Sequence, residues 1–298
     1  MKTTGSPAQE QRRQSLLPLS TTSLTWCTIA VSCFLPQPGY IHVKNLFSVE
    51  GKTVLVTGGS RGIGLMIARG YVENGAIVYI SSRKADVCDA EAAALSKYGE
   101  CHSLPADISD MAGIEKLAAA FSERESKLNI LVNNAGAAWG APIDDFPEQG
   151  WDKVMDLNVK SIFFLTQKLL PQLRAAATAE DPARVINIGS IDGLGTTLME
   201  TYSYPASKAA VHHLTRILAH RLASENINVN AIAPGPFESQ MTEHMLELHS
   251  DKISAENPRG RIGSPEDIAG TAIYLSSRAG AYTTGHVIPV DGGFVNAR

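Results

Sequence analysis

Cysteine and basic charge are both scarce in this chain of 298 residues, and each scarcity argues against a class of function. The four cysteines, at positions 27, 33, 88 and 101, show neither Cys-x-x-Cys spacing nor neighbouring histidine clusters, which argues against a zinc site and favours a reducing compartment. The 26 Lys and Arg residues are scattered among 30 Asp and Glu residues, so no basic face is expected for a nucleic acid. We therefore expect neither a metal nor a nucleic acid as a ligand.

A long apolar run is also missing. The segment Leu24–Leu35 is mainly apolar, but its twelve residues are too few to span a bilayer, which needs about 20. It belongs to an acid-poor stretch rich in Ser and Thr, residues 1–40. Three explanations remain open for this stretch: a transit peptide, a signal peptide with Arg12 and Arg13 before its apolar region, or a disordered or untranslated segment with the true start near Val43 or Lys44.

The change in composition predicts two parts. Residues 1–42 are expected to be a disordered, targeting or mis-assigned extension, and residues 43–298 to form one domain. The domain contains no internal repeat, long linker or further boundary. We expect a cytoplasmic protein, or a mitochondrial one if residues 1–40 are a transit peptide.

From residue 52 onward, short apolar runs of strand-like composition alternate with segments whose apolar residues have helical spacing. The strand-like runs are Val54–Val56, Ile77–Ile80, Ile130–Val132, Val185–Ile188 and Ile227–Ile232. The helical segments include Ile114–Phe121, Val154–Leu173 and Ala209–Leu222, and a further helix start is expected at Ser264-Pro265-Glu266-Asp267. This alternation predicts an α/β fold with a single doubly wound parallel sheet and helices on both faces.

A glycine-rich loop lies between the first strand-like run and a helical segment. Its residues are Thr57-Gly58-Gly59-Ser60-Arg61-Gly62-Ile63-Gly64. The glycines at 58, 62 and 64 allow a sharp turn and a close approach of the backbone to a ligand. Because the N–H groups at the start of the following helix attract phosphate oxygens, the loop predicts a dinucleotide site.

The end of the second strand-like run indicates which dinucleotide. An acid normally binds the ribose hydroxyls of NAD at this point, but here the chain reads Ser81-Ser82-Arg83-Lys84. Arg83 and Ser82 can bind a 2′-phosphate, and Arg61 in the glycine loop can approach it from the other side. The sequence therefore predicts NADP(H) as the cofactor, although both arginines also fit an ordinary charged surface.

Tyr204 and Lys208 lie one helical turn apart and point to the same side of a helix. A nearby ammonium favours phenolate, so Lys208 is expected to lower the pKa of Tyr204 and make it an acid or base. Tyr202 has no lysine at this spacing. Ser190, at the end of the strand-like run Val185–Ile188, can hold a carbonyl oxygen beside the phenol.

These motifs occur together in an order that resembles the short-chain dehydrogenase/reductase family. The resemblance covers roughly residues 50–295 and rests on Thr-Gly-x-x-x-Gly-x-Gly, Asn133-Asn134-Ala135-Gly136, Ser190 and Tyr204-x-x-x-Lys208. It implies a Rossmann fold and an oxidoreductase. One departure is that Ser190 and Tyr204 lie one residue further apart than is commonest in the family, so the loop 191–203 is expected to be reshaped.

The resemblance also implies roles for further residues. Asn158 would hold a water behind Lys208, which would bind the nicotinamide ribose. The remaining residues implied in cofactor binding are Asp107 and Ile108 near the adenine, Asn134, Ala135 and Gly136 beneath the cofactor, and Pro234 and Gly235 at the nicotinamide. His212 and His213 are expected to be packing or interface residues.

Within the family the chain is most similar to 3-oxoacyl-[acyl-carrier-protein] reductases, particularly the branch linked to rhamnolipid synthesis. The similarity lies in Trp139-Gly140, Ala183–Ser190 and Asn228–Gly235. It implies NADPH-dependent reduction of a 3-oxoacyl thioester, acyl carrier protein as a partner, and a homotetramer or homodimer. Another secondary alcohol, polyol, or steroid or quinone-like ketone remains an alternative, as does a non-catalytic dinucleotide-binding protein.

A short apolar segment follows Gly235 where the family has its substrate lid. Phe237, Met241, Met245 and Leu246 keep helical spacing. They either cover an acyl chain or pack onto their own domain.

Overall fold

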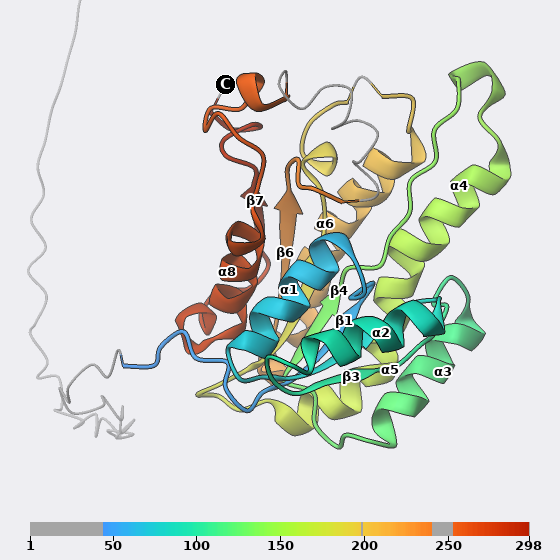
Figure 1. Ribbon diagram of the computed structural model, residues 1–298. Coiled ribbons are helices and arrows are strands. Elements are labelled where there is room, and N and C mark those ends of the chain that lie inside the picture. The colour runs from blue at the N-terminus through green and yellow to red at the C-terminus, as the bar shows by residue number, and fades with distance from the viewer. Residues whose placement is uncertain (1–43, 198, 240–252, 298) are drawn as a thin grey trace, which may run out of the picture. The chain divides into compact units, whose positions relative to one another are not determined.

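The computed structural model describes residues 44–197, 199–239 and 253–297, and these are built on one parallel sheet (Figure 1). The seven strands are arranged in the order β3-β2-β1-β4-β5-β6-β7, and every neighbouring pair is parallel. The strands are β1 (Thr53–Thr57), β2 (Ile77–Ser81), β3 (Cys101–Ser103), β4 (Ile130–Asn133), β5 (Ala183–Ile188), β6 (Ile227–Pro234) and β7 (Val287–Val290). The five strand-like runs expected from the sequence all lie in strands.

Helices connect the strands. The α-helices are α1 (Gly62–Glu73), α2 (Ala85–Leu95), α3 (Met111–Ser122), α4 (Glu148–Met155), α5 (Ser161–Ala176), α6 (Ser203–Leu222) and α8 (Pro265–Ser276). Short helical turns are η1 (Ile143–Asp145), η2 (Asp156–Lys160), η3 (Ile191–Gly193), η4 (Ala223–Glu225) and η5 (Arg278–Gly280). No helix among the described residues is long and apolar enough to cross a bilayer.

The sheet is covered on both faces, as the alternation predicts. Alternate residues of β1 face opposite ways: Val54 and Val56 join a core with α1, α2 and α8, whereas Leu55 joins a core with α3, α5 and α6. Burial on both faces explains why these strands read as continuous apolar runs. The doubly wound parallel sheet predicted from the sequence is confirmed.

One predicted helix is interrupted. The segment Val154–Leu173 was expected to be continuous, but the structure contains a π-helical turn, η2, between α4 and α5. Asn158 lies in this turn and its amide bonds to the backbone of Ala137. A tertiary contact has therefore replaced the regular helical pattern, as is common for π-turns near functional sites.

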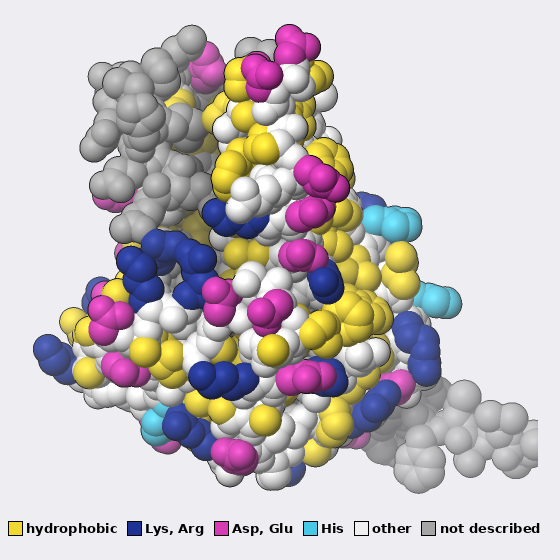
Figure 2. Space-filling view, turned by 90° about the vertical axis from the view of Figure 1, so that its right-hand side faces the viewer, with side chains coloured by type: hydrophobic (Ala, Val, Ile, Leu, Met, Phe, Trp, Pro, Cys, Tyr) yellow, Lys and Arg dark blue, Asp and Glu magenta, His cyan; other side chains and the backbone are white. Residues whose placement is uncertain are grey.

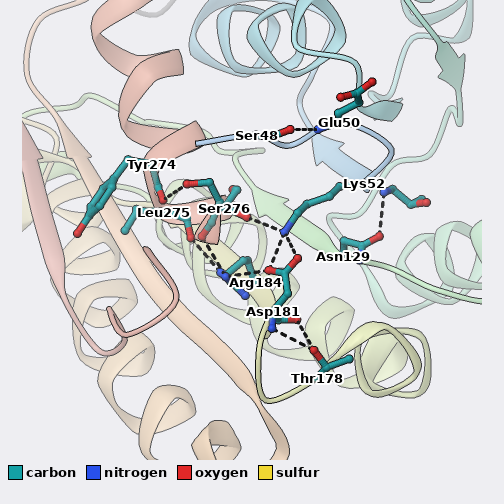
Figure 3. A network of polar contacts seen from close by, with 12 residues as sticks. Ser48, Glu50, Lys52, Asn129, Thr178, Asp181, Arg184, Tyr274, Leu275 and Ser276 are labelled. Atoms are coloured by element: carbon teal, nitrogen blue, oxygen red, sulfur yellow. Dashed lines mark hydrogen bonds and ion pairs between the residues drawn. The ribbon is translucent and has the colours of Figure 1, made fainter. Parts of the chain in front are cut away.

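A charged network holds the carboxyl end of α8 near the amino ends of β1 and β5 (Figure 3). Arg184 donates to the carbonyls of Leu275 and Ser277 at 3.1 Å each, and Lys52 donates to that of Ser276 at 3.2 Å. Asp181 accepts from both cations, at 2.6 Å from Lys52 and 3.2 Å from Arg184. Cations are favourable at a helix carboxyl end, where carbonyls lack helical partners. The network therefore fixes the end of the sheet opposite to the predicted site.

Candidate functional site

The strand order reverses between β1 and β4, because β2 and β3 lie on one side of β1, whereas β4, β5, β6 and β7 lie on the other. A crevice outside the carboxyl ends of such strands is the usual ligand site of a doubly wound sheet. The glycine loop follows β1, Asn134 follows β4, and Ser190 follows β5. The predicted residues therefore gather at one edge of the sheet.

The glycine loop has the conformation that its sequence predicts. Gly58 and Gly62 have φ angles of +64° and +52°, which other L-residues rarely adopt. A Cβ at Gly64 would lie 2.2 Å from the Gly58 carbonyl oxygen, so the first turn of α1 packs tightly on the loop. Arg61, at the amino cap of α1, provides no side-chain cap. The loop and helix start thus form a cradle of backbone N–H groups that fits a pyrophosphate.

Asn134 holds the glycine loop in place. Its Nδ2 donates to the carbonyl oxygens of Thr57 at 3.0 Å and Gly58 at 3.1 Å. In return, Thr57 Oγ1 accepts from the backbone N–H groups of Asn134 and Ala135. The Asn134 side chain is therefore directed to the loop and couples β1 to β4, while its neighbours Ala135 and Gly136 continue along the crevice.

The predicted 2′-phosphate site lies at the carboxyl end of β2. Arg61 and Arg83 are both exposed, and Ser82 is half-buried with its hydroxyl 3.4 Å from the Lys84 carbonyl oxygen. No acid occurs between Ser81 and Lys84. On the face shown in Figure 2, one compact group of Lys and Arg side chains stands out, whereas elsewhere the two signs of charge are interspersed.

Asp107 and Ile108 follow β3 and differ in their exposure. Ile108 is buried in the core beside α3. Asp107 is exposed, and its Oδ1 accepts a hydrogen bond of 3.1 Å from the Ser109 N–H. This is the local turn that an Asp side chain often makes. The carboxylate thus shapes the loop at the edge of the crevice.

Tyr204 and Lys208 lie on the first turns of α6, with Lys208 Nζ 5.5 Å from the centre of the Tyr204 ring. Lys208 is buried and donates to the Ile188 carbonyl oxygen at 2.7 Å. Ser190, also buried, follows β5 beside them. The structure therefore brings together Tyr204 and Lys208, which the sequence predicted for proton transfer, and Ser190, which it predicted to hold a carbonyl oxygen.

The charges of this group are set mainly by burial. Burial lowers the pKa of Lys208 to about 8, while the charge of Asp192 acts in the opposite direction. Burial raises the pKa of Tyr204 to about 12. The negative charge of Asp192 also raises this pKa, whereas a hydrogen bond with Ser190 lowers it. The expectation that the pKa of Tyr204 would be lowered was wrong, because desolvation of the phenolate outweighs the favourable contacts. Tyr204 is thus a phenol at neutral pH.

Asp192 belongs to this group and was not anticipated. It lies in η3, two residues after Ser190, and its backbone N–H donates to Ser190 Oγ at 3.1 Å. Burial raises the pKa of the half-buried carboxyl, whereas Lys208 and the Ser190 hydroxyl lower it. The one feature of the sequence that could have indicated Asp192 as a site residue was its position in the loop between Ser190 and Tyr204.

Asn158 is fully buried. Its Oδ1 accepts from the Ala137 N–H at 2.8 Å, and its Nδ2 donates to the Ala137 carbonyl oxygen and to Ser207 Oγ, both at 2.9 Å. Ser207 Oγ in turn donates to the Tyr204 carbonyl oxygen at 2.7 Å. Asn158 therefore connects the segment after β4 to the start of α6 behind Tyr204.

Pro234 ends β6, and Gly235 lies between the ends of β6 and β7. The Gly235 N–H donates to the Val290 carbonyl oxygen at 3.0 Å. A Cβ on Gly235 would lie 2.8 Å from Asp291 Cβ, so only glycine fits without a shift. The turn thus closes the crevice on the side of β6.

Phe237 is buried in the core and packs against Gly263. Of the two alternatives for the apolar segment after Gly235, packing onto its own domain therefore applies to Phe237. Met241, Met245 and Leu246 lie outside the described residues.

Comparisons with known proteins identify the family of the chain. Residues 58–295 match the family model described as enoyl-(acyl carrier protein) reductase. The rhamnolipids biosynthesis 3-oxoacyl-[acyl-carrier-protein] reductase of Pseudomonas aeruginosa is 54% identical over 252 residues, which cover 83% of this chain and 98% of that protein. The gluconate 5-dehydrogenase of Gluconobacter oxydans is 33% identical, with 84% of this chain and 96% of that protein covered.

A solved structure shows the same fold. The Pseudomonas aeruginosa RhlG/NADP active-site complex is 53% identical and superposes with a TM-score of 0.82, with 84% of this chain and 98% of that chain covered. With the glycine loop, Ser190, Tyr204 and Lys208 arranged at one end of a doubly wound sheet, the chain belongs to the short-chain dehydrogenase/reductase family of oxidoreductases.

Proposed function

We propose that the protein reduces a ketone to a secondary alcohol with NADPH, and that its substrate is a 3-oxoacyl thioester. The observation that supports this most strongly is the group of Ser190, Tyr204 and Lys208 beside the glycine loop. A protein that only binds the dinucleotide has no need of a buried phenol and ammonium. The non-catalytic alternative therefore leaves the composition of this group unexplained.

The residues present fit NADPH, which when bound would supply the hydride. The backbone of residues 58–64 would hold the pyrophosphate, and the exposed Arg61 and Arg83 would pair with the 2′-phosphate. The other residues proposed to contact it are Ser60, Ile63, Ser82, Asp107, Ile108, Asn134, Ala135, Gly136, Lys208, Pro234 and Gly235. The missing acid after β2 removes the charge that would repel the extra phosphate.

The protein's own groups would manage the proton. Ser190 Oγ and Tyr204 Oη would hold the carbonyl oxygen, and Tyr204 Oη would donate its proton to the oxygen as negative charge develops. The high pKa of Tyr204 keeps the phenol protonated for this step. Lys208 would stabilise the phenolate that remains, and Asn158, behind Tyr204, would support proton return from solvent.

The substrate class rests on similarity. The relative that is 54% identical is named a 3-oxoacyl-[acyl-carrier-protein] reductase, whereas the relatives named for gluconate-type substrates are 32–37% identical. A 3-oxoacyl thioester is therefore the first candidate, and acyl carrier protein is the partner that would present it. A sugar-acid ketone is the second candidate, favoured by the several gluconate-named relatives.

We also propose a homotetramer or homodimer. Exposed apolar side chains lie on three successive helices, with Trp151 on α4, Phe163 on α5 and Ile217 on α6. Apolar side chains of this size on neighbouring helices suit contact with a second copy of the chain.

The test follows consumption of NADPH or NADH with acetoacetyl-CoA as a surrogate thioester, and with 5-ketogluconate in parallel. We expect turnover with NADPH and the thioester, and a fall of roughly 10²–10⁴-fold in kcat for Tyr204→Phe because the general acid is lost. Tyr202→Phe is the matched control, since Tyr202 packs edge-on against Phe146 outside the proton path. Near-normal turnover by Tyr204→Phe would disprove the mechanism. Turnover of 5-ketogluconate without turnover of the thioester would make a sugar-acid ketone the substrate in place of the 3-oxoacyl thioester.

A further inference from the structure

His212 is a buried titratable residue beside the catalytic group that the proposed mechanism does not use. It lies one turn after Lys208 on α6 and is 2% exposed. Its Nδ1 is 3.3 Å from the Gly193 carbonyl oxygen, which can only accept, so Nδ1 carries the proton. Its Nε2 is buried and has no hydrogen-bond partner among the described residues.

The imidazole fills the space beneath the segment that carries Ser190. A Cβ on Gly189 would lie 2.1 Å from His212 Nε2, and a Cβ on Gly193 would lie 2.8 Å from His212 Cε1 and 2.7 Å from the Lys208 carbonyl carbon. Both glycines that flank this short segment therefore rest directly on α6. The ring and the two glycines together set how close Ser190 can come to α6.

Packing alone does not explain a histidine at this position. A leucine would fill a similar volume without leaving a buried nitrogen unpaired, and such a group costs about 1–3 kcal/mol. What histidine adds is the Nδ1–H donor to Gly193. Without this donor, η3 would lose its side-chain hydrogen bond to α6 at this point.

The surroundings keep the ring uncharged. Burial lowers the pKa of His212 to about 4, and the positive charges of Lys208 and Arg216 lower it further. The hydrogen bond with the Gly193 carbonyl raises the pKa. The other titratable groups around this segment are Asp192 in η3 and Tyr204 on α6. A charged imidazole would place a second buried cation beside Lys208.

We propose that His212 is a positioning residue, which as the neutral Nδ1–H form holds Gly193 and thereby places Ser190 against Tyr204 and Lys208. This inference rests on the proposed function, because Ser190 is taken to hold the carbonyl oxygen. It goes beyond that function by assigning a role to a residue outside the reacting group.

The experiment compares His212→Leu with His212→Asn in the full chain, with His220→Leu as a control on the exposed side of α6. We expect His212→Leu to lower kcat by roughly 10–100-fold, as small misplacements of a catalytic group do. Its KM for NADPH should not rise, because no cofactor contact is removed. His212→Asn should recover most of kcat although it leaves a cavity, because its amide can still donate to Gly193.

Two kinetic outcomes would overturn the inference: a normal kcat for His212→Leu, or a kcat for His212→Asn as low as that of His212→Leu. Nitrogen NMR of the wild-type chain with labelled histidine gives an answer that needs no turnover. A proton on Nε2 of His212, or titration near the ordinary histidine pKa of about 6.5, would also overturn it. Absence of ketone turnover with the Nδ1–H signal intact would instead refute the proposed function.

Discussion

At the scale of single residues, Asp192 places a carboxylate beside the tyrosine and the lysine that are proposed to transfer the proton. It raises the pKa of both neighbours, because a negative charge disfavours phenolate and favours ammonium. Both effects keep Tyr204 protonated and Lys208 charged. Asp192 thereby favours the state required for ketone reduction.

Replacement of Asp192 should move the pH dependence of reduction in a defined direction. In Asp192→Asn the pKa values of Tyr204 and Lys208 both fall, so the alkaline limb of kcat/KM for the ketone moves to lower pH. The interacting groups titrate together, so the shift belongs to the group as a whole. The measurement is a pH–rate profile of both enzymes, and an unchanged or higher alkaline limb would contradict the assignment.

Arg83 is predicted to favour NADPH over NADH by binding the 2′-phosphate. Loss of a charge-assisted hydrogen bond to a phosphate costs about 1.5–3 kcal/mol, so Arg83→Ala should raise KM for NADPH by roughly 10–100-fold. KM for NADH, which lacks the 2′-phosphate, should change little. Lys84→Ala, at the adjacent exposed position, is the control. Equal effects of Arg83→Ala on the two cofactors would remove Arg83 from the phosphate site.

At the scale of elements, tertiary contacts explain two features that the local sequence did not indicate. The π-turn at Asn158 divides a segment that reads as one amphipathic helix, because bonds to Ala137 compensate for the interrupted pattern. Likewise, Arg184 in the apolar strand β5 is 1% exposed. It is accommodated because its guanidinium binds the carboxyl end of α8 and Asp181.

Removal of that guanidinium should weaken the fold without disturbing the site. In Arg184→Met the carbonyls of Leu275 and Ser277 lose their donor, and we expect the free energy of unfolding to fall by about 2–4 kcal/mol. Arg174→Met is the control, because its pair with Glu225 is at the surface and should contribute about 1 kcal/mol or less. Urea titration measures both, and equal losses would contradict a special role of the α8 contact.

The turnover of Arg184→Met gives a second check. Its network lies near the amino ends of β1 and β5, opposite to Ser190 and Tyr204. The kcat of the folded variant should therefore remain within about twofold of wild type, since the catalytic geometry is unaffected.

At the scale of the whole molecule, residues Val43–Arg298 form a compact unit of their own, and every proposed site residue belongs to that unit. We therefore propose that residues 43–298 are sufficient for folding and catalysis. A chain that begins at Val43 should have the melting temperature and kcat of the full chain, measured side by side. A large loss in either would show that residues 1–42 contribute to the folded enzyme.

The local patterns of the chain were sufficient for the five inner strands β1, β2, β4, β5 and β6, the glycine loop and the placement of Tyr204 and Lys208, but not for the edge strands β3 and β7. Each depends on a short-range rule: strand and helix periodicity, the positive φ of Gly58 and Gly62, and the one-turn spacing on α6. The family resemblance added Asn158, which the structure places against Ser207; its role as holder of a water behind Lys208 remains a prediction.

Burial and long-range contacts required the tertiary structure. The pKa of Tyr204 rises where spacing alone suggested a fall, because the cost of desolvation depends on everything packed around the phenol. Asp192 and His212 acquire significance only when η3 folds onto α6, which brings residues of a loop beneath and beside the catalytic pair. The sequence thus specified the proposed catalytic pair, while its protonation and its support depend on how the surrounding residues pack in the folded chain.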